Sequence, residues 1–208
     1  MENMEKTPRL LISFVTDNSA SMEGERLGAL VAAFRAFAER MKGNPIVEWE
    51  LLTFDTFAPA VVKSFESDTV APVAGERFPL LGRAVLTAAQ RLHDRVGALK
   101  QQGHHVFRPW MFILSDGFTM DAMEEAAVKL DGLEKNGELL YLPFRLSKEL
   151  TTERLQCLDR NKHMIEILPE GIDGFFAFVE RMIEQRAALA PDVGVKFAKT
   201  DFEGWAVL

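Results

Sequence analysis

The sequence predicts an α/β protein with a doubly wound, mostly parallel six-stranded sheet, one antiparallel edge strand and helices on both faces. Short, continuous apolar runs alternate along the chain with segments of helical periodicity, which is the pattern of repeated strand–helix units. One pair of strand-like segments has only a short connection between its members. The length of 208 residues, with 48% hydrophobic and 26% charged residues, suits one globular domain.

Four apolar runs predict strands that are covered on both faces. Runs of this kind are typical of parallel strands buried beneath helices on either side. They occupy residues 10–15, 110–114, 139–144 and 164–168.

Helices are predicted where apolar residues recur at spacings of three and four, because such residues share one face of a helix. Three segments show this pattern over residues 27–41, 81–99 and 123–133. Two further helices are expected near residues 152–158 and 174–190.

The alternation is interrupted once. Residues 47–53 have a strand pattern, and a second strand-like run at residues 60–65 follows closely. The connection around residues 55–59 is too short for a crossover helix, so the two strands should form an antiparallel hairpin.

We expect a single domain over residues 1–208, with its core at about residues 8–190. Residues 191–208 lose helical periodicity. A packed extension, an extra strand and a loose tail all remain compatible with that segment.

Composition argues against several classes of function. The net charge of −7, without a basic patch, disfavours nucleic-acid binding. No apolar run approaches the roughly 20 residues of a membrane span, and residues 1–9 lack a signal-peptide core. The single Cys157 excludes an internal disulfide, and a cytoplasmic location is expected. Phosphate-binding and dinucleotide-binding glycine motifs are missing from the sequence.

Polar residues follow two of the predicted strands. Asp17, Ser19 and Ser21 are spaced so that one carboxylate and two hydroxyls can point to the same place, and Asp116 follows the strand at 110–114. Ligands of open α/β sheets bind at the carboxyl ends of strands. Oxygen donors of this kind suit Mg²⁺ or Mn²⁺. The alternative is that Asp17 and Ser19 form a turn and cap the next helix.

These motifs resemble those of the von Willebrand factor A (vWA) domain. Residues 17–22, Asp-Asn-Ser-Ala-Ser-Met, are similar to the D-x-S-x-S-M motif of its metal-ion-dependent adhesion site (MIDAS), and residues 112–117 are similar to its later strand that ends in Ser/Thr-Asp-Gly. The order of strands and helices agrees too. Within the family, the short chain, the helix opening at residues 81–85 and the late Phe175-Phe176 pair are most similar to bacterial stand-alone proteins of the tellurite-resistance type.

The resemblance implies a non-enzymatic adaptor in a bacterial stress or tellurium-resistance multi-protein system. Its metal ligands would be Asp17, Ser19, Ser21 and Asp116, and a partner protein would offer an Asp or Glu to the Mg²⁺ or Mn²⁺.

One departure from the family pattern is expected to matter. Pro79 stands where the family usually supplies a metal-binding threonine. This leaves open a vWA scaffold with a degenerate metal site that binds partners without metal. A Mg²⁺-dependent phosphoryl-transfer enzyme is a further alternative, which Ser19 disfavours because such enzymes often carry a second Asp at that position.

Two other features flank the predicted site. Asp121, with Glu124 three residues later, predicts a capping box at the start of the helix over residues 123–133, and Thr119 is an alternative cap for it. Phe118 and Met22 would form an apolar rim around the metal or serve as buried loop anchors.

Overall fold

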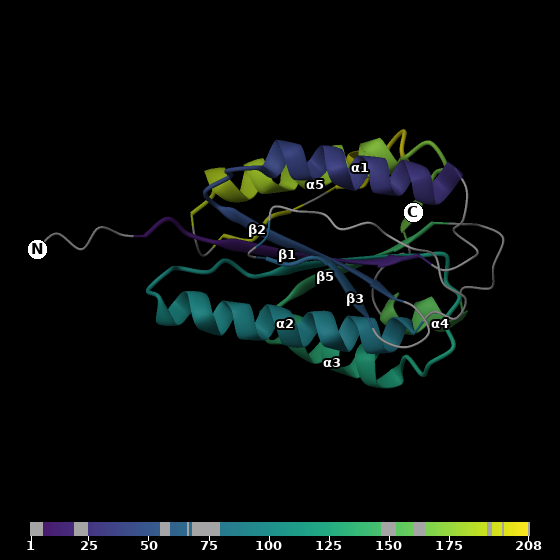
Figure 1. Ribbon diagram of the computed structural model, residues 1–208, viewed down its shortest axis with the longest axis horizontal. Helices are drawn as coiled ribbons and strands as arrows, with labels where there is room; N and C mark the ends of the chain where they lie inside the picture. The colour runs from purple at the N-terminus through teal and green to yellow at the C-terminus, as the bar shows by residue number, and fades with distance from the viewer. Residues whose placement is uncertain are drawn as a thin grey trace, which may run out of the picture.

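The computed structural model describes residues 6–18, 25–54, 59–65, 67, 80–146, 153–159, 165–190, 193–196 and 198–207. In this part of the chain, a twisted central sheet lies between two layers of helices (Figure 1). The strands are β1 (Leu10–Asp17), β2 (Val47–Phe54), β3 (Ala60–Lys63), β4 (Trp110–Ser115), β5 (Leu140–Arg145), β6 (Ile165–Ile167) and β7 (Ala206–Val207). The helices are α1 (Glu25–Met41), α2 (Leu81–Gln101), α3 (Glu124–Lys135), α4 (Glu153–Gln156) and α5 (Ile172–Ala188), with short 3₁₀ turns at Cys157–Asp159 and Lys199–Phe202.

The strand order is β3-β2-β1-β4-β5-β6-β7. The five inner strands are parallel, whereas β3 is antiparallel to β2 and β7 is antiparallel to β6. The predicted doubly wound, mostly parallel α/β fold is therefore confirmed, including the antiparallel hairpin. The C-terminal segment adds a seventh strand, so each edge of the sheet is antiparallel.

The face of the sheet beneath α1 and α5 carries an aromatic core. Phe14 on β1 lies at its centre and is fully buried. Each fully buried aromatic side chain stabilises the fold by roughly 1.5–3 kcal/mol. The rings within 6.3 Å of Phe14, measured between centroids, are those of Phe34, Phe37, Trp49, Phe112, Phe175 and Phe176.

The other face of the sheet packs against α2, α3 and α4 through aliphatic residues. Val15, which follows Phe14 and points to the opposite side, belongs there to one buried cluster with Val85 and Leu92 of α2. Both faces of β1 are thus covered, which explains why its sequence is apolar without alternation.

The C-terminal segment is part of the core. Phe202 and Trp205 are buried, and the Leu168 backbone N–H donates to the Trp205 carbonyl at 2.9 Å. A Cβ on Gly174 would lie 2.3 Å from Trp205 Cβ, so α5 needs a glycine where the tryptophan packs. The segment is a packed extension that also supplies a strand. None of the described helices is both long enough and apolar enough to cross a membrane.

Candidate functional site

The candidate site lies where β1 and β4 end. These strands are adjacent and parallel, with Thr16 opposite Leu114, so their carboxyl ends meet at one edge of the sheet. Asp17 is the last residue of β1, and Asp116 directly follows β4. The structure therefore brings two of the four predicted metal ligands to neighbouring strand ends. Ser19 and Ser21 lie outside the described residues, as do Met22 and Pro79.

A buried hydrogen bond joins the two strand ends. Ser115 Oγ donates to Asp17 Oδ2 at 3.2 Å, and both residues are fully buried. Asp116 is almost as inaccessible, with 1% of its surface exposed. Two carboxylates are thus held away from bulk water at one edge of the sheet.

The turn after β4 depends on a glycine. Gly117 has a φ of 98°, a conformation that residues with a side chain rarely adopt. Its N–H donates to Ser115 Oγ at 3.1 Å, and the Phe118 N–H donates to Asp116 Oδ1 at 2.9 Å. The turn therefore orients the Asp116 carboxylate through the backbone N–H of Phe118.

The next residues of this loop hold the first turn of α2. The Leu81 N–H donates to Thr119 Oγ1 at 3.0 Å. The N–H groups of Gly82 and Arg83 donate to the two carboxylate oxygens of Asp121, at 3.1 and 2.8 Å. Thr119 Oγ1 in turn donates to Asp121 Oδ1 at 2.5 Å. We call Thr119 and Asp121 the α2 clasp, because they satisfy N–H groups that a helix start leaves without internal partners.

The prediction that Asp121 or Thr119 caps the helix at residues 123–133 is wrong. That helix, α3, begins at Glu124 and has no side-chain cap at Met123. Asp121 and Thr119 cap α2 instead, although α2 starts about 40 residues earlier in the chain. Local sequence spacing indicates a cap but does not reveal which helix receives it when two helices start at the same edge of a sheet.

Gly82 allows α2 to approach this loop closely. A Cβ at residue 82 would lie 2.6 Å from the Ala122 carbonyl oxygen and 3.1 Å from Asp121 Oδ2. The loop after β4 and the start of α2 are therefore packed as one unit beside Asp116.

Two apolar side chains of the same loop are exposed. Phe118 is 43% exposed and Met120 is 54% exposed, whereas Thr119 between them is buried. Phe118 is therefore not a buried loop anchor, and its place in a rim around the metal stays a prediction. The sequence interpretation missed Met120, although its position two residues after Phe118 in the same loop was the signal for it.

The described donors suit a hard cation. Asp17 and Asp116 offer only oxygen atoms, and a cation between buried carboxylates would offset their mutual repulsion. Among the described residues, no group of three or more His, Cys, Asp or Glu side chains is placed to hold a metal ion. A complete site would therefore need the hydroxyls of Ser19 and Ser21.

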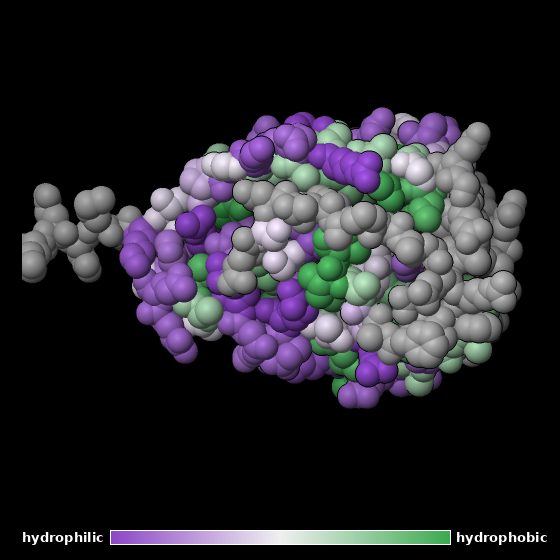
Figure 2. Space-filling view, in the orientation of Figure 1, coloured by the Kyte–Doolittle hydropathy of each residue, from purple (hydrophilic) through white to green (hydrophobic). Residues whose placement is uncertain are grey.

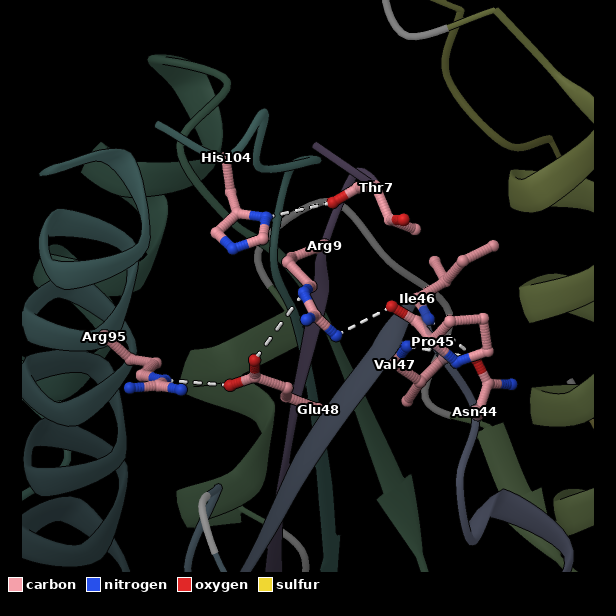
Figure 3. Close-up of polar contacts among 9 residues, drawn as sticks. All are labelled: Thr7, Arg9, Asn44, Pro45, Ile46, Val47, Glu48, Arg95 and His104. Atoms are coloured by element: carbon pink, nitrogen blue, oxygen red, sulfur yellow. Dashed lines mark hydrogen bonds and ion pairs between the residues drawn. The ribbon is translucent and has the colours of Figure 1, made fainter. Parts of the chain in front are cut away.

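The opposite end of the sheet carries contacts that fix the strand starts (Figure 3). Glu48 accepts a hydrogen bond from Arg95 Nε at 2.8 Å and lies 3.9 Å from Arg9 Nε. Arg9 Nη1 donates to the Pro45 carbonyl at 2.7 Å, and His104 Nδ1 lies 3.1 Å from the Thr7 carbonyl. These pairs join β1, β2 and α2, and we assign them a structural role.

A groove of about 500 Å³ also lies away from the strand ends that carry Asp17 and Asp116, between the C-terminal halves of α2 and α3. Its walls combine aliphatic residues with His93, Lys100, Arg108 and Glu138. Glu138 is the single carboxylate among these lining residues, so the groove lacks the set of oxygen donors that Mg²⁺ or Mn²⁺ prefers. The candidate site therefore stays at the carboxyl ends of β1 and β4.

Comparisons with known proteins identify the fold. No protein-family model and no curated protein sequence matches the chain. Among solved structures, the VWA domain of SpRpn10 superposes with a TM-score of 0.55 at 14% identity, over 82% of this chain and 95% of that domain. The chain has the vWA fold. Proximal thread matrix protein 1 of the mussel byssus matches at a TM-score of 0.54 and 14% identity, over 89% of this chain and 47% of that protein.

At 14% identity the two superpositions show the shared fold alone. The function must therefore be argued from the residues of this chain.

Proposed function

We propose that this protein is a non-enzymatic, metal-dependent protein-binding module. Asp17, Ser19, Ser21 and Asp116 would hold Mg²⁺ or Mn²⁺, and an Asp or Glu of a partner protein would complete the coordination. One observation carries the proposal: Asp17 and Asp116 are buried at the ends of adjacent parallel strands, and Ser115 links the two ends.

The residues of this chain would have separate tasks. Asp17 and Asp116 supply negative charge, and Ser19 and Ser21 supply neutral oxygen atoms. Ser115 orients the Asp17 carboxylate, and the Phe118 N–H orients that of Asp116. When bound, the cation offers an electrophilic position to an incoming carboxylate, since Mg²⁺ readily keeps exchangeable ligands.

The cellular setting is a wider part of the proposal. The resemblance to bacterial stand-alone vWA proteins of the tellurite-resistance type supports a cytoplasmic adaptor within a multi-protein stress system. The short chain, the helix opening at residues 81–85 and the Phe175-Phe176 pair are the basis for this assignment.

A degenerate metal site is the competing function. In that case the vWA scaffold binds its partner without metal, a possibility that follows from Pro79 at the position of the family threonine. The two functions differ in whether the isolated protein takes up a divalent cation at Asp17 and Asp116.

The test is calorimetric titration of protein stripped with EDTA, first with Mg²⁺ and then with Mn²⁺. We expect saturable binding by the wild type, and its loss in Asp17→Asn and in Asp116→Asn, which remove one charge at nearly constant shape. Asp94→Asn is the matched control, because Asp94 lies on the exposed side of α2 and bonds only to Gln90 among the contacts described. Thermal denaturation of each variant would verify folding.

Lack of wild-type binding up to millimolar metal would contradict a stand-alone metal site and favour the degenerate scaffold. Equal binding by wild type and both site variants would place the cation elsewhere on the chain.

A further inference from the structure

We propose that Phe118 and Met120 form the apolar half of a docking surface whose polar half is the proposed metal site. The partner that this surface fits is a peptide segment with an acidic residue next to a large apolar residue. The inference rests on the proposed function, because the acidic residue needs a cation at Asp17 and Asp116.

Exposure is the first observation. Phe118 and Met120 are 43% and 54% exposed, although the fold buries most of its large apolar residues. Figure 2 shows one face of the molecule, on which hydrophilic residues cover much of the described surface and hydrophobic patches are small. Two large apolar side chains within one short loop, beside buried polar groups, are typical of a binding surface.

The second observation is that the loop holds these side chains outward. Residues alternate along the loop. Thr119 and Asp121 bond inward to α2, whereas Phe118, before Thr119, and Met120, between Thr119 and Asp121, are exposed. The α2 clasp therefore fixes the backbone on either side of Met120. A partner would gain apolar contact without first having to order the loop, which reduces the entropic cost of binding.

Position is the third observation. The Phe118 N–H bonds to Asp116 Oδ1 at 2.9 Å, so this aromatic residue is tied to a carboxylate that would bind the cation. When the partner's acidic residue reaches the cation, the residues one or two positions away from it in the partner's sequence would come close to Phe118. One of those neighbours would cover the exposed ring.

Charge explains why the apolar contact is needed. The chain carries a net charge of −7, which repels an acidic segment at long range. The cation offsets this repulsion only at the site itself, and the remaining long-range repulsion depends on the salt concentration. Apolar contact with Phe118 and Met120 is not screened, so it would supply salt-independent affinity and select among acidic segments.

The test uses random peptides displayed on phage and selected on the full chain in Mg²⁺, with parallel selections in EDTA. We expect Mg²⁺-dependent enrichment of peptides with Asp or Glu within two positions of Phe, Leu, Ile, Met or Trp. One enriched peptide is then synthesised, and its affinity is measured by fluorescence anisotropy. The Phe118→Ser/Met120→Ser double variant should bind it about tenfold or more weakly, the effect typical of central interface residues. The single variant Met120→Ser, which lies outside the proposed metal site, should keep the Mg²⁺ affinity of the wild type and still bind the peptide more weakly.

Val128→Ser is the matched control, since Val128 is 61% exposed on α3 but lies outside the loop. It should bind the peptide as the wild type does. Acidic peptides that bind the double variant as well as the wild type would overturn this inference and leave the metal-dependent function standing. Peptides that bind equally in EDTA and to Asp116→Asn would instead overturn the proposed function. Enrichment of basic peptides would contradict both the proposed function and the docking surface. A selection in which no peptide is enriched on the wild type relative to the double variant would contradict the docking surface.

Discussion

Ser115 Oγ donates a hydrogen bond to Asp17 Oδ2 at 3.2 Å and accepts one from the Gly117 N–H at 3.1 Å. One buried hydroxyl therefore organises both the end of β1 and the turn that carries Asp116. The two aspartates are 99 positions apart in the sequence, and this side chain connects their immediate surroundings.

We predict that Ser115→Ala destabilises the protein by about 1–3 kcal/mol, because the buried Gly117 N–H loses its acceptor and Asp17 loses a donor. Urea denaturation would measure this change in the free energy of unfolding. Thr87→Ala is the control: its hydroxyl bonds only to the Arg83 carbonyl on the surface of α2 among the contacts described. Equal stability of Ser115→Ala and the control would contradict the role given to Ser115.

Asp121→Ala should lower the free energy of unfolding by about 1–2 kcal/mol, as loss of a helix cap does. The reason is that the N–H groups of Gly82 and Arg83 lose their acceptors, and the negative charge near the α2 N-terminus is removed. Thermal denaturation would show a lower midpoint. Asp94→Ala, on α2 itself but remote from its start, should leave the midpoint within experimental error. A large effect of the control and none of Asp121→Ala would refute the α2 clasp.

Two glycines of α2 should respond in opposite directions to alanine. Gly82→Ala would place a Cβ 2.6 Å from the Ala122 carbonyl oxygen, so it should destabilise the fold and weaken any metal uptake at Asp116. Gly97→Ala meets no atom within 4 Å and should stabilise the helix by about 0.5–1 kcal/mol. Denaturation of the two variants side by side would test this, and a stabilised Gly82→Ala would show that the loop can move away from α2.

The sequence predicts most of this fold because most elements carry their own local pattern of apolar residues. The buried strands β1, β4, β5 and β6 are apolar runs, and α1, α2, α3 and α5 carry apolar stripes at helical spacing. Strand β7 cannot be predicted in this way, because its two residues are too few to show a periodic pattern of hydrophobicity. Its position depends on Trp205, which packs against Gly174 and bonds through its carbonyl to Leu168.

The candidate site is predictable in part for a related reason. The motif at residues 17–21 and Asp116 can be found in the sequence because parallel strands end at the same edge of a sheet. The partners of Thr119 and Asp121 cannot be found in this way, because their hydrogen bonds reach across the fold to α2. Packing between distant parts of the chain decides which helix a short polar segment caps.

A buried carboxyl group predicts a pH dependence of stability. Glu50 on β2 is fully buried; Ser13 Oγ donates to its Oε1 at 2.8 Å, and Arg91 Nε donates to its Oε2 at 2.7 Å. Burial raises the pKa of Glu50 above its ordinary value of 4.5, and the bonds from Arg91 and Ser13, together with the charges of Arg91 and Lys63, oppose that rise.

The sign follows from proton binding. Between pH 4.5 and the raised pKa, folded Glu50 retains a proton that the unfolded chain has released. The folded state therefore binds more protons, and the free energy of unfolding contributed by this group falls as pH rises through that window. Glu50→Gln has no such proton to lose, so its stability relative to the wild type should increase with pH over the same window. Urea denaturation from acidic to mildly alkaline pH would measure the two curves. Parallel curves for the wild type and Glu50→Gln would show that folding leaves the pKa of Glu50 unchanged, and would contradict this prediction.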